Sequence, residues 1–445
     1  MRIVQITPGS GGGFYCENCL RDIALVRAMR KLGHDVIMAP LYLPLQARPQ
    51  GVSPSGVGKS EPVCNAPIFF GGVNVYLQQK LSLFRKTPRW IDRLFDSPGL
   101  LGWVAGKTGM TSARDLGMTT ISMLRGEQGR QIKELDRLVE WLSAPDNKAD
   151  VICLSNILLV GLARRIKEKL NTPLVCLLQD EHGFLDGLAR PYSEQAWQIV
   201  AERAKDIDAF LAVSKYYGDF MQQRLGLDTD RVRVGYAGIS LEGYGPRQSR
   251  PQKPTIGFLS QTCSEKGLDT LVEAFITLKK NEKLKTAKLR IAGGHDGGDK
   301  TFLKQIRRRL DSCDLSDDVE FLTDFDRDAK QAFLSSLSLL CVPEKQPVAY
   351  GLYVLEALAA GVPAVQPAIG VFPELLETTG GGLLYDPDDT GQPARSIERL
   401  LLDPDYAEEL GRKGREVVQR KFDVEKTARE TVRIYEEIIK KLPRG

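Results

Sequence analysis

A glycine-rich stretch follows the first apolar run of the sequence. Residues 7–13 read Thr-Pro-Gly-Ser-Gly-Gly-Gly, and the residues after them fit a helix. Glycines let backbone amides come close to a phosphate or a sugar, and a helix N-terminus adds partial positive charge. The spacing differs from the G-x-G-x-x-G dinucleotide pattern. We expect Gly12 and Gly13 to lie beside a bound ligand; the alternative is a loop that binds nothing.

A lysine occupies a comparable place in the second half of the sequence. The tetrapeptide Ser264-Glu-Lys-Gly267 comes shortly after an apolar run that fits a strand, Thr255–Leu259. The ammonium of Lys266 is suited to clamp the two phosphates of a diphosphate. A lysine in a strand–helix loop is usually only solvated, so this assignment depends on the motifs around it.

The third motif is Tyr350-Gly-Leu-Tyr-Val-Leu-Glu-Ala-Leu-Ala-Ala-Gly-Val-Pro363. Gly351 opens a predicted helix whose first amides have no intrahelical partner and can bind an anion. Gly361 and Pro363 are typical of the end of such a helix. Glu356, in the second turn, can accept both hydroxyls of a ribose; the alternative is a surface acid.

The elements that must position these residues are short strands alternating with amphipathic helices. We expect strands at 2–7, 35–41, 150–154, 174–178, 209–213, 255–259, 288–292, 319–322 and 339–342. This alternation predicts βαβ units and parallel sheets. The segment 246–254 carries three prolines and reads as a linker. The predicted fold class is therefore α/β, with two doubly wound, Rossmann-like domains facing a ligand cleft at the carboxyl ends of their strands.

Composition excludes several classes of protein. A chain of 445 residues exceeds one ordinary core, in line with two domains. The net charge of +4 does not favour a nucleic-acid partner. Neither a long apolar run nor a leader is evident, so we expect a cytoplasmic protein. Eight cysteines and three histidines argue against a disulfide framework and a His-rich metal site. The Cys16–Cys19 pair has metal or redox spacing but no second pair, and we interpret it as packing.

Taken together, these segments resemble glycosyltransferase family 4, the retaining, nucleotide-sugar-dependent enzymes of the GT-B fold. The resemblance covers nearly the whole chain and is most specific in the second half. It rests on six stretches: 208–217, 235–239, 257–275, 290–294, 351–363 and 373–377.

The resemblance implies a hexosyltransferase-like enzyme of glycan biosynthesis. A nucleoside diphosphate sugar would be held mostly by the second domain, and a carbohydrate or lipid-linked acceptor by the first. Such enzymes generally use no metal or other cofactor, because positive side chains and helix dipoles stabilise the leaving diphosphate. Lys266 and His182 are the catalytic candidates. The donor-binding candidates are Gly12, Gly13, Ser260, Gln261, Gly293, Gly351, Leu352, Tyr353 and Glu356.

Three positions depart from the family pattern. A glutamate that contacts the donor sugar is expected eight positions before Glu356, with seven residues between the two; this chain has Val348 there, and Glu344 stands too early to replace it. An arginine is expected where the chain has Gln261, and an amide cannot form a bidentate charged pair with diphosphate. Relatives would have Gly at 180 and Asp at 182, where the chain has aspartate and His182. His182 either reaches the donor sugar or only bonds a neighbour.

These departures favour a changed donor preference or impaired catalysis. One alternative is therefore a relative that binds a nucleotide sugar or glycan without turnover. A second alternative is a sugar-nucleotide epimerase of the same architecture, which the scarcity of acid–base candidates disfavours.

We expect the domains at residues 1–246 and 255–423, with a final helix at 424–445 crossing back onto the first domain. A helical insertion is expected at about 81–145. Its basic, aromatic part, 81–107, is typical of segments that lie on a membrane surface. The alternative is that it shields the acceptor cleft.

Overall fold

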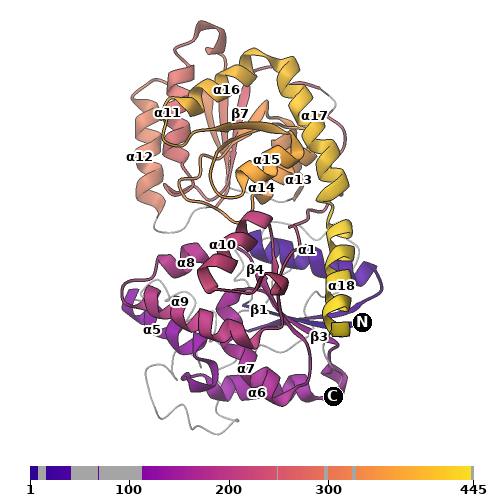
Figure 1. Cartoon of the computed structure of the whole chain (residues 1–445). Helices are drawn as coiled ribbons and strands as arrows, with labels where there is room; N and C mark the ends of the chain where they lie inside the picture. The colour runs from indigo at the N-terminus through magenta and orange to yellow at the C-terminus, as the bar shows by residue number, and fades with distance from the viewer. Residues whose placement is uncertain are drawn as a thin grey trace, which may run out of the picture.

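The computed structural model describes residues 1–8, 17–41, 69, 113–247, 249–294, 299–322 and 327–441. Two parallel six-stranded sheets form the two halves of the molecule, one above the other in Figure 1. The α/β class and the pair of doubly wound domains predicted from the sequence are confirmed. Gly12, Gly13, Cys16 and the segment 81–107 lie outside the described residues.

The first sheet has the order β2-β1-β3-β4-β5-β6. Its strands are β1 (Arg2–Thr7), β2 (Asp35–Pro40), β3 (Val151–Leu154), β4 (Leu174–Leu178), β5 (Ala209–Ala212) and β6 (Val232–Val234). The helices around it are α1 (Glu17–Lys31), α5 (Ala113–Leu124), α6 (Ile132–Ser143), α7 (Ala163–Lys169), α8 (His182–Asp186), α9 (Tyr192–Arg203) and α10 (Lys215–Leu225).

The second sheet has the order β12-β11-β10-β7-β8-β9. Its strands are β7 (Thr255–Leu259), β8 (Lys288–Ala292), β9 (Val319–Leu322), β10 (Leu339–Cys341), β11 (Ala364–Pro367) and β12 (Gly382–Tyr385). The helices in this second half of the chain are α11 (Leu268–Leu278), α12 (Lys300–Asp311), α13 (Arg327–Ser335), α14 (Leu352–Ala359), α15 (Phe372–Thr379), α16 (Gln392–Leu402), α17 (Pro404–Lys421) and α18 (Val424–Lys441).

Both faces of the first sheet are buried, which explains why its strands read as continuous apolar runs. Along β1, Val4 and Ile6 face the main core, whereas Ile3 faces a smaller cluster formed with α1 and α18. The last helix therefore covers the first sheet, although the chain reaches it only after the second domain. Figure 1 shows α18 beside α1. Tyr435 of α18 is fully buried, and its hydroxyl lies 3.2 Å from Cys153 Sγ.

The strand order reverses between β10 and β7 in the second sheet, because β8 and β9 lie on one side of β7 and β10 lies on the other. In parallel sheets, ligands bind beyond the carboxyl ends of the strands at such a reversal. The segments that follow β7 and β10 begin at residues 260 and 342, and these carry the motifs singled out in the sequence.

Candidate active site

Lys266 and Glu344 meet at the strand-order reversal of the second sheet. The Lys266 ammonium donates to Glu344 Oε1 over 2.9 Å, and the Tyr353 hydroxyl donates to the same oxygen over 3.0 Å. Glu344 is almost completely buried, and burial raises the pKa of its carboxyl while the Lys266 charge opposes this. The Lys266 side chain keeps 28% exposure, so the ammonium is held by a buried acid yet open to solvent.

The backbone beside Lys266 needs a glycine. Gly267 has φ of 72°, in the left-handed region, and directly precedes α11. A Cβ at this position would overlap the Pro343 carbonyl oxygen. The loop after β7 and the loop after β10 therefore touch at their backbones, which brings Lys266 to Glu344. Glu344 was set aside in the sequence analysis; its place directly after a buried strand was the signal that could have found it.

Glu356 lies on a helix that is buried on all sides. All eight residues of α14 are buried, and the Glu356 carboxylate pairs with the Lys330 ammonium of α13. Glu356 is therefore not a surface acid. Its ion pair is separate from that of Lys266.

The amino end of α14 starts at Gly351, which packs against Phe372. Leu352 and Tyr353 form its first turn, and both side chains are buried. Tyr353 serves the site through its hydroxyl, which holds Glu344 in place. What these first residues can offer a ligand is their backbone amides.

Three donor-binding candidates lie after β7 and β8. Ser260 is buried, and its amide donates to Ala292 at the end of β8. Gly293 has φ of 139°, and a Cβ there would overlap the Ser260 carbonyl oxygen. The Gln261 side-chain amide donates to Asp299 Oδ2 over 3.1 Å. The neutral amide expected to weaken diphosphate binding is thus held by a carboxylate at the start of α12.

His182 lies at the contact between the two domains. Its Nε2 is 3.1 Å from the carbonyl oxygen of Pro347, and its ring packs edge-on against Phe220. Nδ1 lies 3.6 Å from Asp180 Oδ1 and makes no hydrogen bond. Nε2 of His182 thus contacts the segment after β10 of the second domain.

Asp180 makes a second contact between the domains. Its Oδ1 accepts a hydrogen bond from the Ala349 amide over 2.7 Å. Its φ is 77°, which explains why a glycine is expected here. Burial raises the pKa of the Asp180 carboxyl, whereas the charges of His182 and Lys266 and the bond from Ala349 lower it. The Lys266 charge of the second domain thus acts on the pKa of an acid of the first domain.

Two further contacts join α10 to the second domain. The Ser214 hydroxyl, at the N-cap of α10, donates to the Ala349 carbonyl oxygen over 2.7 Å. The Glu374 carboxylate of α15 accepts from the amides of Lys215 and Tyr216 over 3.0 and 2.7 Å. These are amides of the first helical turn, which have no partner within the helix. The sequence analysis missed Glu374 in this role, because the partners are backbone groups of another domain.

The buried acid Glu181 is hydrogen-bonded within the first domain next to His182. Glu181 accepts from the amides of Ile157 and Gln179 and from the Tyr217 hydroxyl, over 3.1, 2.8 and 2.9 Å. Burial raises the pKa of Glu181 to about 7, and these hydrogen bonds limit the rise. The Tyr217 hydroxyl accepts in turn from the His182 amide over 3.2 Å. The start of α8, and with it His182, is thereby fixed on the first domain.

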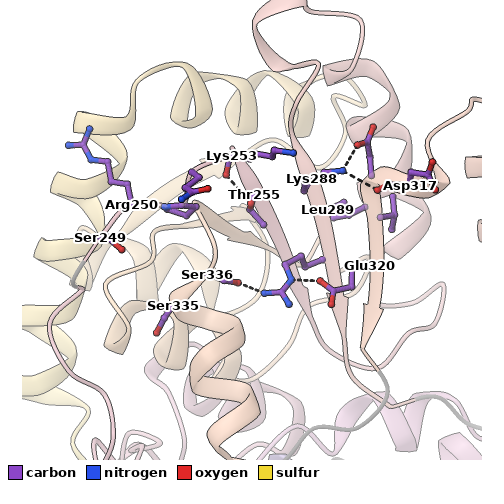
Figure 2. A pocket seen from close by; sticks show the side chains of 15 residues that line it. Ser249, Arg250, Lys253, Thr255, Lys288, Leu289, Asp317, Glu320, Ser335 and Ser336 are labelled. Atoms are coloured by element: carbon purple, nitrogen blue, oxygen red, sulfur yellow. Dashed lines mark hydrogen bonds and ion pairs between the residues drawn. The ribbon is translucent and has the colours of Figure 1, made fainter.

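A cavity of about 600 Å³ lies at the opposite edge of the second sheet, where its strands begin (Figure 2). Two ion pairs line it: Lys288 donates to Asp318 over 2.7 Å, and Arg290 donates to Glu320 over 2.6 Å. Arg290 also donates to the Ser336 hydroxyl, and dashed lines in Figure 2 mark bonds at Lys288, Glu320 and Ser336. Because the carboxyl ends of the strands point away from this cavity, we do not place the donor here.

Within the described ranges, no group of three or more His, Cys, Asp or Glu side chains is arranged to hold a metal ion. Over the same ranges, no helix combines the length and the apolar character that a membrane span requires.

Comparison with known proteins agrees with this architecture. Solved structures that cover nearly all of the chain include sucrose-phosphate synthase from Thermosynechococcus elongatus, with a TM-score of 0.68, 18% identity and coverage of 99% of this chain and 100% of that one. The Anabaena protein HepE in complex with UDP-glucose gives a TM-score of 0.66 at 14% identity, covering 98% and 99%. The two facing domains thus define the GT-B fold.

Sequence comparison names the family. The model "Glycosyl transferases group 1" matches residues 246–417, and "Glycosyltransferase Family 4" matches residues 119–242. A GDP-mannose-dependent alpha-(1-6)-phosphatidylinositol monomannoside mannosyltransferase of Mycobacterium tuberculosis is 30% identical over 199 residues, which are 43% of this chain and 49% of that protein. The match thus spans about half the length of this curated relative. The chain belongs to glycosyltransferase family 4.

Proposed function

We propose that this protein is a retaining, metal-independent glycosyltransferase that moves a sugar from a nucleoside diphosphate sugar to an acceptor hydroxyl. The observation that carries the proposal is the position of Lys266. Its side chain is 28% exposed and lies at the strand-order reversal of the second sheet, and its charge lowers the pKa of Asp180 in the facing domain. A cation in this place meets the diphosphate of a ligand bound between the domains.

The chemistry assigned to these groups is electrostatic. The acceptor oxygen bonds to the anomeric carbon while the bond from that carbon to the phosphate oxygen breaks, and the acceptor proton passes to the departing diphosphate. Negative charge grows on the diphosphate during this step. Lys266 and the first amides of α14 stabilise that charge, and because they are fixed before the reaction they need little reorganisation. Glu356 is assigned to the ribose hydroxyls and would exchange part of its contact with Lys330 for them.

The donor is a nucleotide sugar by analogy with the relatives, whose names specify GDP-mannose in one case and UDP-glucose in another. The acceptor is a carbohydrate or a lipid-linked saccharide, held by the first domain. Peripheral contact of this domain with a membrane through residues 81–107 remains part of the proposal.

The first experiment is calorimetric titration of the protein with UDP and GDP. Lys266→Ala should weaken binding about 10–100-fold, the contribution of one hydrogen bond to a charged group. Glu356→Ala should also weaken it, whereas Lys285→Ala, at an exposed lysine paired with Glu282 far from the cleft, should not. If both cleft variants bind as tightly as the parent, the site assignment is wrong.

A second candidate function is binding of the nucleotide sugar without turnover. Two observations favour it: Val348 is buried and apolar, and the Gln261 amide is held by Asp299. Incubation with UDP-glucose, GDP-mannose and other donors, followed by measurement of free nucleoside diphosphate and of transfer to sugars, separates the two. Turnover with any donor rejects the binding-only function.

A further inference from the structure

The carboxylate of Asp180 has one oxygen engaged and one available. Oδ1 accepts from the Ala349 amide over 2.7 Å and lies 3.6 Å from His182 Nδ1. Oδ2 accepts no hydrogen bond from any residue that the structure describes. The side chain is 32% exposed, so this oxygen is open to a ligand.

Asp180 has a backbone conformation that is unfavourable for an aspartate. Asp180 has φ of 77°, a conformation that suits glycine and few other residues. A glycine would adopt this conformation without strain, and position 180 lies outside β4, which ends at Leu178. Strained residues of this kind gather at functional sites, where the side chain has a task that offsets the strain.

The surroundings of Asp180 define what its available oxygen can bind. The charged and titratable groups that act on its pKa, or on whose pKa it acts, include Lys266, Glu344, His182, Tyr216 and Tyr217. Lys266 is the group assigned to the diphosphate. A carboxylate repels the phosphates themselves, so its partner must be a hydrogen-bond donor that is attached to them. The hydroxyls of the donor sugar meet this requirement.

The second domain offers no acid in this region that is available to accept from the donor sugar: Val348 is apolar and Glu344 is already bonded. Val348, next to the amide that Asp180 holds, is buried and has no polar side-chain atom. Glu344 of that domain is occupied by Lys266 and Tyr353. A sugar attached to a diphosphate at Lys266 would therefore find its carboxylate on the opposite side of the cleft.

We propose that Asp180 positions the donor sugar: its Oδ2 accepts a hydrogen bond from a sugar hydroxyl, so that the first domain supplies the acid that position 348 of the second domain lacks. This inference rests on the proposed function. It makes Asp180 a determinant of specificity for the donor sugar. The contact with Ala349 fixes the carboxylate before the donor arrives.

Asp180→Asn is the sharpest variant, because an asparagine oxygen can still accept from the Ala349 amide while its NH₂ group replaces the available acceptor. Asp180→Gly removes both contacts and suits the backbone. Asp186→Asn, on α8, is the matched control, because its oxygen can still accept from Trp197. Calorimetry with UDP and UDP-glucose, and with GDP and GDP-mannose, gives for each protein the ratio of the two dissociation constants.

We expect the parent and Asp186→Asn to share one ratio for the preferred pair. Asp180→Asn should weaken the sugar-bearing ligand about 10-fold relative to its nucleoside diphosphate. Binding of the nucleoside diphosphate alone should stay equal or become stronger, because a nearby negative charge is removed.

An unchanged ratio in Asp180→Asn overturns the inference while leaving the proposed function intact. The inference is also overturned if Asp180→Gly weakens both ligands equally and Asp180→Asn weakens neither, because Asp180 would then only join the domains. If the parent binds none of the four ligands, the proposed function itself fails.

Discussion

The Lys266 ammonium donates to Glu344 Oε1 over 2.9 Å, so the cation assigned to the diphosphate already has an anionic partner. Glu344 is buried and fixed by Tyr353 as well, whereas Lys266 reaches solvent. An incoming diphosphate therefore shares Lys266 with Glu344. The acid orients the lysine and also competes with the ligand for it.

Glu344→Gln should strengthen nucleoside diphosphate binding. The amide oxygen can still accept from Lys266 and Tyr353, but the competing negative charge is gone. At a separation of a few ångströms this change corresponds to about 10-fold in affinity. Titration with UDP and GDP measures it, with Glu282→Gln, at an exposed glutamate paired with Lys285, as the control. Weaker binding in Glu344→Gln would show that orientation outweighs competition.

Gly267→Ala should destabilise the second domain and displace Lys266. The left-handed φ of 72° costs a residue with a Cβ about 1–2 kcal/mol, and the added carbon meets the Pro343 carbonyl oxygen. Urea unfolding should show the loss in stability, and titration should show weaker UDP or GDP binding. Gly183→Ala, where a Cβ has no neighbour within 4 Å, is the matched control. Equal stability of the two variants would mean that the 267 backbone is not fixed.

Glu374→Ala should loosen the contact between the domains. Two amides at the start of α10 lose a carboxylate partner. A hydrogen bond to a charged group contributes a net free energy of about 1.5–3 kcal/mol. Hydrogen exchange at Lys215 and Tyr216 should become faster. Glu377→Ala, exposed on the same helix, should leave it unchanged. Unaltered exchange in Glu374→Ala would argue against this contact in solution.

Glu181 should make stability depend on pH. Its pKa is about 7 in the folded protein against an ordinary value of 4.5, so between these values the folded chain holds a proton that the unfolded chain has released. Stability therefore falls as pH rises from 4.5 to 7, by up to about 3 kcal/mol from this group. Glu181→Gln removes the contribution.

The measurement is the free energy of unfolding in urea at several pH values. The difference between Glu181→Gln and the parent should grow in favour of the variant as pH rises from 4.5 to 7 and stay level above it. Exposed Glu436→Gln should follow the parent throughout. A constant difference for Glu181→Gln across this range would show that Glu181 does not hold its proton when folded.

The strands and helices could be predicted from local sequence, because both sheets are parallel and buried on both faces. Strands such as Leu174–Leu178 are then unbroken apolar runs, which stand out against amphipathic helices. The strand 255–259 agrees at both ends with the prediction, and the motifs at Lys266 and Gly351 directly follow strands or begin helices. The sequence thus also located the edge of the second sheet at which the candidate site lies.

The partners of the site residues were decided only by the tertiary structure. Glu344 is 78 residues from Lys266, and Asp180 is 169 residues from the Ala349 amide it holds. Neither pair has a sequence spacing that could be recognised, because each depends on two loops meeting at the end of a sheet or across the cleft. Local sequence determined which segments form strands and helices through their apolar periodicity. Lys266 meets Glu344 because the loops after β7 and β10 touch within the second domain, whereas Asp180 meets the Ala349 amide because the two domains face each other.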